Sequence, residues 1–485
     1  MAISRREFLY GSATAFLSAS FSGQLARASG NDKKVLVMGG GVAGLCAAYE
    51  LQRAGCEVIV FEQRPIPGGR IMSLREPFAD NQVAEAGAMV LATKVIEDYV
   101  AEFGLPTVPV DMGAIMSAAY FLRGQRITAD EQRKYHWPID VKDDEQGLGR
   151  NELLAKYWYG PIAKSRESLT LADFPFKQLP EMDQVTLADF WREQGASEAA
   201  IEIMTIGYFD GVGDGPETYS ALSAMTDVVG FRSQTMTGPP FQIAGGNDLL
   251  PGAFAERLGE AVQYSSPVLA IDQNDEGVNL VIQGAEGQHQ VKGDFLVCAT
   301  PLNVLHKVQL PKNWPDWRRQ AYARIKTTSI TRTFLQFSER FWETAGRSPA
   351  ARTDLPIQGV NGMATRQPGE RGILESFAGG AKARTIGAMS DDDAIEFVLS
   401  EMSKIHPEAP EYFETGAIVR WDTEPGLYGC QAWFKPGQLH EYFPRLAEPE
   451  GRIHFAGDHV GGVPGYAFAA LLSGQKAALD ILESV

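Results

Sequence analysis

The chain has few cysteines and few histidines for its length of 485 residues. Four cysteines do not form the disulfide framework of a small secreted scaffold in a chain this long. Cys46 and Cys298 lie in apolar segments and are expected in the core, and Cys56 is expected beside the first turn between a helix and a strand. The seven histidines form no cluster with the spacing of metal ligands, so we expect no metal site.

Basic residues are scarcer than acidic ones. The 44 Lys and Arg residues against 61 Asp and Glu residues give a net charge of −17, which disfavours nucleic acid and anionic membrane surfaces as partners. An acidic surface would favour the approach of a cationic substrate, although such surfaces often serve only solubility. The sequence also lacks internal repeats and, beyond its first 28 residues, any apolar run of about 18 residues, so we expect no membrane span.

The first 28 residues have the pattern of an export signal. Arg5 and Arg6 form a twin-arginine pair, residues 10–21 are moderately apolar, and Ala26 and Ala28 suit the last positions before a cleavage site. Because the twin-arginine export route carries folded proteins, we expect a periplasmic or secreted protein that takes up its cofactor before export. The alternative is a frayed helix with a chance pair of arginines.

The most informative motif is a glycine-rich turn near the N-terminus. Residues 35–38 predict a buried parallel strand, and residues 45–53 predict the helix after the turn. Gly39 permits the tight turn, Gly41 lets the backbone approach a pyrophosphate, and Gly44 lets the helix pack on the strand. The helix N-terminus offers N–H groups and the positive end of its dipole to phosphates.

An acidic residue follows at the distance that a dinucleotide site requires. Residues 58–61 predict a second strand, which leads to Glu62, 18 residues after Gly44. A carboxylate at this place can accept hydrogen bonds from both hydroxyls of a ribose. A lone glycine pattern is a weak signal, but strand, turn, helix, strand and acid in this order make a specific one.

Three further segments suit the same site. Residues 64–70 form a turn-rich stretch in which Arg70 can reach phosphate, and residues 85–89 are small enough for a flat ring system to lie against the backbone. Residues 453–458 predict a strand that ends in a Gly-Asp pair. The two halves of one cofactor site lie at opposite ends of the chain, which implies interleaved domains.

These motifs resemble those of the FAD-dependent amine oxidase superfamily, which includes monoamine, polyamine and L-amino-acid oxidases. The resemblance covers nearly everything after residue 32, including Gly68 and the later pair Ser473 and Gly474, and it implies FAD under the glycine-rich turn. The residues that it implies for binding the cofactor are Gly39, Gly41, Val42, Ala43, Gly44, Glu62, Gly69, Arg70, Ala88, Met89, Val268, Gly457, Asp458, Tyr466 and Ala467.

A chain of this length exceeds one compact core and should divide into two domains. We expect a mixed α/β fold in which a Rossmann-type FAD-binding domain is interleaved with a substrate domain of sheet plus helices. The FAD-binding domain would comprise residues 33–90, 241–300 and 421–485. The substrate domain would comprise residues 91–240 and 301–420, and its many aromatic residues are more often core than pocket. The sequence further predicts helices over residues 151–159 and 467–478, a strand over residues 326–337, hairpin turns at Gly277 and Gly287, and a helix cap at Ser390.

Within the superfamily the sequence is most similar to the L-amino-acid oxidase branch, but two positions differ. The resemblance places an Arg and a Tyr that bind the substrate carboxylate where this chain has Val90 and Phe377. Both substitutions remove hydrogen-bond donors, and burying an unpaired carboxylate costs several kcal/mol. We therefore expect a substrate without the α-carboxylate. The alternative is that another arginine, such as Arg232 or Arg384, has taken over.

A third difference concerns the reaction with oxygen. Where relatives place a lysine that holds a water beside flavin N5, this chain has Arg332, and Lys326 is a less suitable substitute. Arginine keeps the charge but does not readily give up its proton. A dehydrogenase that uses another electron acceptor is therefore an alternative to an oxidase.

The resemblance also implies an aromatic cage around the substrate amine. Tyr466 matches the aromatic residue of the C-terminal motif and Trp433 the opposite wall, with Gln431 as a competing alignment. Such rings accept a neutral amine or a cation. The expected substrate residues are Val90, Tyr208, Phe377, Trp433 and Tyr466, and the expected catalytic residues are Arg332, Trp433 and Tyr466.

The sequence thus predicts a flavoenzyme that oxidises the C–N bond of an amine to an imine, which hydrolyses to a carbonyl compound and ammonia while O2 is reduced to H2O2. Cys430 lies where some monoamine oxidases attach flavin, but the match is weak and we expect non-covalent FAD. The alternatives are an L-amino-acid oxidase with a relocated carboxylate clamp, a flavin dehydrogenase or desaturase, and a non-redox flavin protein. The sequence leaves open whether the protein forms a homodimer.

Overall fold

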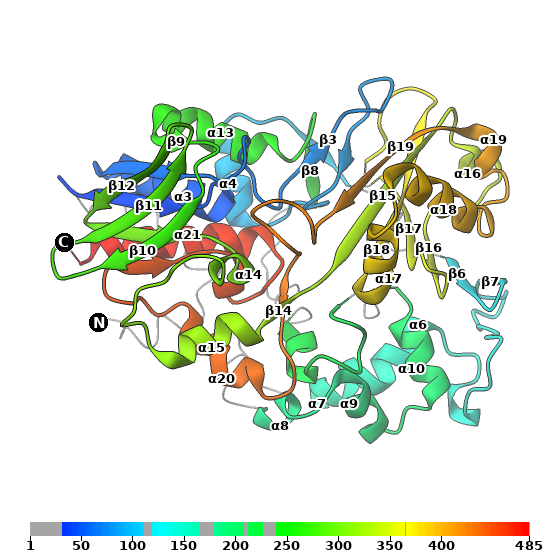
Figure 1. Cartoon of the computed structure of the whole chain (residues 1–485). Helices are drawn as coiled ribbons and strands as arrows, with labels where there is room; N and C mark the ends of the chain where they lie inside the picture. Colours follow the sequence, from blue (N-terminus) through cyan, green and yellow to red (C-terminus); the bar gives the residue numbers. More distant parts are fainter. Residues whose placement is uncertain are drawn as a thin grey trace.

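The computed structural model describes residues 32–110, 119–164, 179–207, 212–226, 239–363 and 365–484. The predicted export signal, Tyr208 and Arg232 lie outside these residues. Figure 1 shows two lobes, one built on a parallel sheet and the other on a larger sheet, with a group of helices below the second. The mixed α/β fold is confirmed. No described helix combines the length and the hydrophobicity needed to cross a membrane.

The parallel sheet is assembled from distant stretches of the chain. All of its neighbouring strands pair in parallel. The strand that comes first in the sequence, residues 34–38, carries the apolar run typical of a strand that is buried on both faces. The predicted boundaries of the FAD-binding domain and the substrate domain stay a prediction. In spatial order the strands are β21 (Ile453–Phe455), β13 (Phe295–Cys298), β1 (Lys34–Met38), β2 (Glu57–Phe61) and β9 (Val262–Gln263).

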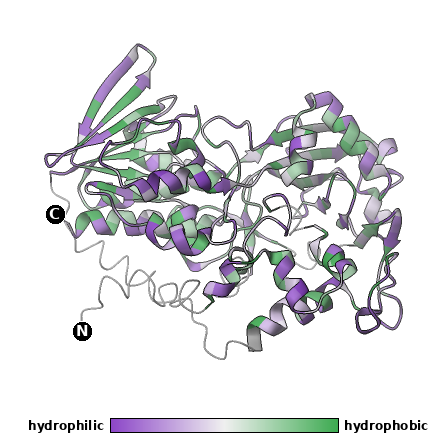
Figure 2. Cartoon of the chain, turned by 60° about the horizontal axis from the view of Figure 1, so that its bottom comes forward, coloured by the Kyte–Doolittle hydropathy of each residue, from purple (hydrophilic) through white to green (hydrophobic). Residues whose placement is uncertain are grey.

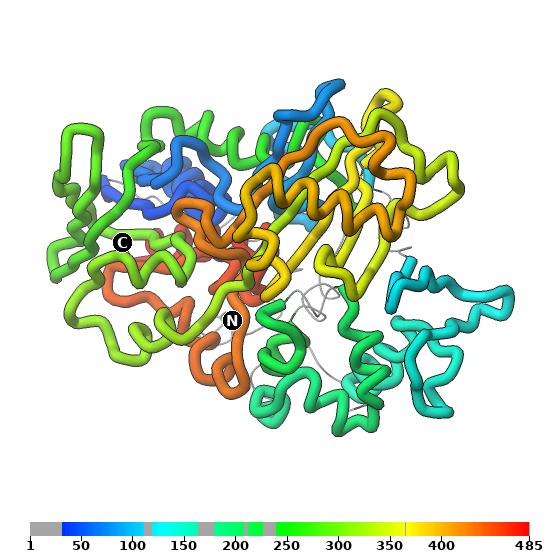
Figure 3. Tube along the Cα trace, turned by 45° about the vertical axis from the view of Figure 1, so that its right-hand side comes forward, coloured from blue at the N-terminus to red at the C-terminus, as the bar shows by residue number. Residues whose placement is uncertain are grey.

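Two helices from opposite ends of the chain pack together on this sheet. The helices α3 (Val42–Arg53) and α21 (Ala467–Leu482) lie side by side in Figures 1 and 3. Gly474 permits the close contact, because a Cβ there would lie 2.3 Å from the carbonyl oxygen of Ala43. The sequence predicts both helices, although α3 begins earlier and α21 ends later than expected. The helices α4 (Lys94–Glu102) and α13 (Leu249–Leu258) complete this layer.

A small antiparallel sheet adjoins this lobe. It consists of β10 (Val268–Gln273), β11 (Val278–Gly284) and β12 (Gly287–Gly293). The predicted turns at Gly277 and Gly287 are confirmed, and the φ of +118° at Gly287 is one that glycine adopts readily.

The second lobe contains a seven-stranded sheet, antiparallel except where β16 pairs with β6. Residues 326–337 are not the single strand that the sequence predicts. The chain changes sheets within this segment, because β14 (Lys326–Thr327) pairs with β20 (Ala432–Trp433) while β15 joins the large sheet. In spatial order the large sheet contains β19 (Phe413–Arg420), β15 (Ile330–Phe337), β18 (Gly372–Gly379), β17 (Gly359–Gly362), β16 (Ala351–Thr353), β6 (Ala119–Leu122) and β7 (Gln125–Ile127).

Helices cover one face of the seven-stranded sheet. The helices α17 (Gly380–Gly387) and α18 (Asp391–Ser403) pack there against apolar side chains that include Leu335. Ser390 accepts a hydrogen bond from the N–H of Asp393 at 3.2 Å, which confirms the predicted helix cap. Green and purple segments alternate along many helices in Figure 2, as expected for helices with one packed face and one solvated face.

The helical region below the sheet buries much of the aromatic mass. Trp158 and Trp191 are fully buried and belong to the core, as the sequence predicts for most of this set. The segment predicted as one helix over residues 151–159 is a short α-helix that continues as a π-turn. The region contains α6 (Arg150–Leu154), α7 (Gly160–Lys164), α8 (Pro180–Asp183), α9 (Leu187–Glu193) and α10 (Glu198–Thr205).

Short elements connect these layers. They are β3 (Ser73–Leu74), β4 (Ala84–Glu85), β5 (Thr107–Pro109), β8 (Phe241–Ile243), α14 (Leu302–Leu305), α15 (Asp316–Arg324), α16 (Phe341–Thr344), α19 (Ala409–Tyr412) and α20 (Gln438–Leu446).

Candidate functional site

The glycine-rich turn between β1 and α3 forms a backbone cradle. Gly39 has a φ of +108°, and a Cβ at Gly44 would lie 2.0 Å from the carbonyl oxygen of Gly39. Gly69 approaches from the other side, where its Cβ would lie 3.2 Å from the Cα of Gly41. No side chain caps the start of α3, so the N–H groups of Val42 and Ala43 remain available to an anion. The cradle fits a pyrophosphate.

Glu62 lies directly after β2, beside this cradle. Its side chain is 7% exposed, and its two carboxylate oxygens accept the N–H groups of Gly40 at 2.6 Å and Arg64 at 2.7 Å. Burial raises the pKa of Glu62, although these N–H groups and the charge of Arg64 act in the opposite direction. A carboxylate oxygen has more than one acceptor position, so Glu62 can still accept hydroxyls of a ribose.

Arg70 and Asp458 connect the two ends of the chain. Both Nη atoms of Arg70 donate to the carboxylate of Asp458, and Nη1 also donates to the carbonyl of Cys430 at 2.9 Å. The N–H of Gly465 donates to Asp458 at 2.7 Å. Burial alone would raise the pKa of Asp458, but the charge of Arg70 and the neighbouring His459 hold it well below its usual range. Asp458 is therefore ionised and holds Arg70 beside the cradle.

Residues 87–90 form a half-buried segment that leads to α4 of the first lobe. Gly87 is required there, because a Cβ would lie 2.1 Å from the carbonyl oxygen of Arg70. The side chains of Asn247 and Gln242 donate to the carbonyls of Ala88 at 2.8 Å and Met89 at 2.6 Å. Nothing local in the sequence marks these two amides as partners of a segment more than 150 positions earlier, so they could not be predicted.

Arg332 is buried and held on several sides. Its guanidinium donates to Glu375 through Nε and Nη2 and to the carbonyl of Gly87 at 3.1 Å. The other oxygen of Glu375 accepts the amide of Asn361 at 2.8 Å. Arg332 thus adjoins the segment that was expected to face a flavin ring, but Glu375 compensates its charge. No local pattern in the sequence indicates that Glu375 pairs with Arg332.

Phe377 lies next to Arg332 in the sheet. The two residues face each other across β15 and β18, and the Cζ of Arg332 lies 5.3 Å from the centroid of the Phe377 ring. Phe377 and Val90 are both half-buried. Arg384, considered as a replacement carboxylate clamp, is 48% exposed and pairs with Asp214, so the structure does not bring it to this place.

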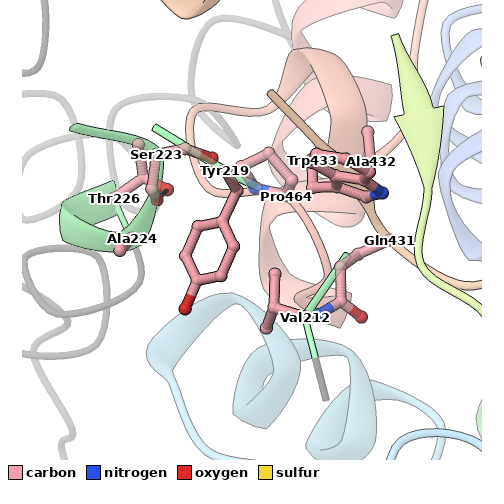
Figure 4. Close-up of a pocket in the computed structure, with 9 residues that line it drawn as sticks. All are labelled: Val212, Tyr219, Ser223, Ala224, Thr226, Gln431, Ala432, Trp433 and Pro464. Atoms are coloured by element: carbon pink, nitrogen blue, oxygen red, sulfur yellow. Dashed lines mark hydrogen bonds between the residues drawn. The ribbon is translucent and has the colours of Figure 1, made fainter. Parts of the chain in front are cut away.

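An aromatic pocket lies at β20, between the lobes (Figure 4). Trp433 forms part of its wall, as the sequence analysis expects of a substrate residue. Tyr466 does not line this pocket but follows Pro464, which does, and its ring packs against Phe468 at a centroid distance of 5.4 Å. Tyr219 is a lining residue that the sequence analysis missed. The lining residues are Val212, Tyr219, Ser223, Ala224, Thr226, Gln431, Ala432, Trp433 and Pro464.

Two further candidate groups can be placed. The thiol of Cys430 is half-buried near Arg70 and Asp458, and burial raises its pKa above the usual value. Val268 begins β10 close to Glu62, because the N–H of Ser266 donates to the carbonyl of Glu62 at 2.8 Å. In the part of the chain that the structure describes, no group of three or more His, Cys, Asp and Glu side chains could hold a metal ion.

Known proteins resemble this chain over nearly its whole length. The sequence model of one family, described as flavin containing amine oxidoreductase, matches residues 42–482. YobN of Bacillus subtilis (strain 168), named as a proposed L-amino-acid oxidase, is 27% identical over 478 residues, covering 94% of this chain and 95% of YobN. The L-amino-acid oxidase of Demansia vestigiata is 26% identical over 465 residues, covering 93% of this chain and 87% of that protein.

Solved structures show the same fold. Cyclohexylamine oxidase from Brevibacterium oxydans IH-35A gives a TM-score of 0.77 at 20% identity, covering 93% of this chain and 99% of that chain. Putrescine oxidase bound to putrescine gives a TM-score of 0.75 at 20% identity, with the same coverage.

Proposed function

Because the chain belongs to the family of flavin-containing amine oxidoreductases, and therefore oxidises amines with a flavin, we propose that its flavin is non-covalent FAD and that its substrate lacks an α-carboxylate. The observation that supports a substrate without an α-carboxylate is the pair Val90 and Phe377, two half-buried apolar side chains, of which Phe377 faces Arg332 in the sheet. Neither can bind a carboxylate, and an unpaired carboxylate is costly to bury.

The cradle would hold the dinucleotide part of FAD. Gly41, Val42 and Ala43 would offer backbone N–H groups to the pyrophosphate, and Glu62 would accept ribose hydroxyls. Asp458 keeps Arg70 at the opposite side of this cradle. The thiol of Cys430 has a raised pKa, which keeps it protonated and unreactive and is consistent with a non-covalent flavin.

Flavin, when bound, supplies an acceptor for the hydride that leaves the carbon next to the amine. The protein's own contribution is to orient that carbon and to exclude water. Trp433 and Tyr219 present aromatic surface to an amine, and Val90 and Phe377 keep the neighbouring space apolar. The imine product hydrolyses in water to a carbonyl compound and ammonia, and no protein base is needed for that step.

We propose O2 as the electron acceptor and H2O2 as its product. The oxidases among the similar proteins support this. Arg332 argues against a fast reaction with O2, because a guanidinium that is compensated by Glu375 is a poor proton donor. A slow reaction with oxygen would favour a dehydrogenase with another acceptor.

The twin-arginine pattern in residues 4–9 supports export of the folded protein to the periplasm or the medium. A comparison of wild type with Arg5→Lys/Arg6→Lys tests this. The wild type should be found with its flavin outside the cytoplasm and the variant inside it. Equal distribution of the two would contradict the proposal.

The first experiment mixes the FAD-loaded enzyme anaerobically with phenethylamine or with phenylalanine and follows the loss of flavin absorbance by stopped flow. Reduction by phenethylamine alone is the expected result. Reduction by phenylalanine alone would show that another cation binds the α-carboxylate, and the protein would then be an L-amino-acid oxidase like its named relatives. Admitting oxygen to the reduced enzyme and assaying peroxide tests the acceptor.

A further inference from the structure

One row of facing residues crosses the seven-stranded sheet from the flavin side to its far edge. Arg332 faces Phe377, Phe377 faces Gly359, Gly359 faces Arg352, and Arg352 faces Tyr120. Directly facing residues in a sheet project from the same side. The side chain of Arg352 therefore lies on the same face as Arg332 and Phe377, which is the face that borders the candidate site.

Arg352 reaches across Gly359 toward Phe377. A Cβ at Gly359 would lie 3.5 Å from Nη1 of Arg352, which is ordinary van der Waals contact, so the guanidinium lies directly beside this glycine. Nη1 donates to the side-chain oxygen of Asn361 at 2.7 Å. Asn361 in turn donates to Glu375, the partner of Arg332. A continuous chain of hydrogen bonds thus fixes the two arginines relative to each other.

Arg352 keeps unused donors, and the carboxylate whose charge acts on it, Glu375, already binds Arg332 and Asn361. Its Nη1 makes longer bonds to the carbonyls of Ala351 and Val360, at 3.3 and 3.4 Å. No bond from Nε or Nη2 and no carboxylate within 4.0 Å occurs in the described ranges. Burial lowers the pKa of Arg352 and the charge of Arg150 lowers it further, while the charge of Glu375 acts in the opposite direction. A charged group in such a place is costly unless an anion joins it.

Arg150 supplies a second positive charge at the same place. It begins α6, is half-buried, and donates through Nε to the carbonyl of Met204 at 3.1 Å. Burial lowers its pKa, while Tyr120 and Tyr219 lie close enough to raise it. Tyr120 is also the sheet neighbour of Arg352, and Tyr219 lines the aromatic pocket. The two arginines therefore adjoin the pocket that contains Trp433.

We propose that Arg352 and Arg150 form an anion subsite for a carboxylate that the substrate amine carries away from its reacting carbon. This inference rests on the proposed function. The planar fork of arginine matches a carboxylate. Asn361 and Glu375 lie between the guanidinium groups of Arg352 and Arg332. A carboxylate bound by Arg352 would therefore be separated from the segment beside Arg332 by these two side chains. The substrate class is thus an ω-amino acid.

The test uses the FAD-loaded enzyme and three five-carbon compounds. These are pentylamine, 5-aminopentanoate, which carries a distal carboxylate, and norvaline, which carries an α-carboxylate. Anaerobic stopped flow gives the rate of flavin reduction by each. Pentanoate, which has no amine to oxidise, is titrated separately, and its Kd is read from the perturbation of the flavin spectrum. We expect 5-aminopentanoate to exceed pentylamine in kcat/KM by about tenfold or more.

Substitutions locate the effect. Arg352→Gln should lower the preference for 5-aminopentanoate over pentylamine in kcat/KM by about tenfold or more, and it should weaken the binding of pentanoate by a similar factor. Arg352→Lys should retain part of the preference and part of the affinity for pentanoate. Arg384→Gln is the matched control, because Arg384 belongs to the same lobe but is exposed and paired with Asp214. It should leave the preference unchanged. The wild-type comparison and the pentanoate titration keep the test valid if Arg352→Gln fails to fold.

The outcomes separate the inference from the proposed function. Equal rates with pentylamine and 5-aminopentanoate, together with no binding of pentanoate, would overturn the subsite and leave amine oxidation intact. Norvaline as the best substrate would overturn the distal position of the carboxylate. If no amine reduces the flavin, the proposed function itself fails, yet pentanoate can still show whether the two arginines bind an anion.

Discussion

The guanidinium of Arg70 donates to both carboxylate oxygens of Asp458, 388 positions further along the chain. Arg70 follows the first nucleotide segment, and Asp458 follows the last strand of the parallel sheet. The same arginine binds the carbonyl of Cys430, and the same aspartate binds the N–H of Gly465. One ion pair therefore holds together three segments that border the proposed cofactor site.

Asp458→Asn should reduce both the stability and the flavin content of the purified protein. The substitution leaves the charge of Arg70 without its partner, which costs about 2 to 3 kcal/mol because Arg70 keeps some contact with solvent. Urea unfolding and the ratio of flavin to protein absorbance measure the two effects. The control is Asp248→Asn, which breaks the more exposed pair with Arg75 and should cost less than about 1 kcal/mol. Equal losses in the two variants would contradict a special role for Asp458.

Glu85 should make the protein less stable as the pH rises from about 4.5 to about 7. Burial raises the pKa of this carboxyl to about 7, although Ser73 and the N–H of Asn247 bind it. The folded state therefore holds a proton that the unfolded chain has already released, and the free energy of unfolding falls over this range, by up to about 3 kcal/mol.

Glu85→Gln should remove most of this fall, because the amide cannot titrate but can still bind Ser73. Urea unfolding of both proteins at pH 5 and pH 8 provides the comparison. A fall of the same size in the variant would show that another group causes the pH dependence.

Gly44→Ala should prevent flavin binding and destabilise the parallel sheet. The new Cβ would lie 2.0 Å from the carbonyl oxygen of Gly39, so the turn or the helix must move by more than the cradle allows. Gly252→Ala is the matched control, since it lies within α13 with nothing within 4 Å of the added atom. That variant should gain about 0.5 to 1 kcal/mol. The flavin content and the thermal unfolding of the two variants test whether the added Cβ at Gly44 disrupts the cradle.

Local geometry explains which parts of the site could be predicted from the sequence. The turn at Gly39 and Gly44, the acid at Glu62 and the cap at Ser390 depend on residues that are near one another in the chain. The placement of Arg352 depends instead on the register of β15, β18, β17 and β16, which no local pattern specifies. The sequence therefore suggested Arg384 as a replacement for the arginine that binds the carboxylate, whereas the pairing of distant strands places Arg352 beside the site.

The compensation of the charge of Arg332 could not be predicted either, because it also depends on the pairing of distant strands. Arg332 could be identified by its position, but its partner Glu375 lies 43 residues later and becomes a neighbour only when β15 and β18 pair. Asn361, which connects Glu375 to Arg352, lies on a third strand. Chemistry that depends on a network across several strands can be stated only from the structure.

Arg332→Lys should speed the reaction of the reduced enzyme with oxygen. A lysine at this position keeps a positive charge but can release a proton, which a guanidinium held by Glu375 and the carbonyl of Gly87 does not do. A positioned proton donor contributes about 100-fold or more to such steps, so a gain of about tenfold is a conservative expectation. Stopped-flow reoxidation over a range of oxygen concentrations gives the rate constant. Arg332→Gln removes the charge and should be slower than wild type, and a lysine variant no faster than wild type would show that oxygen reactivity is set elsewhere.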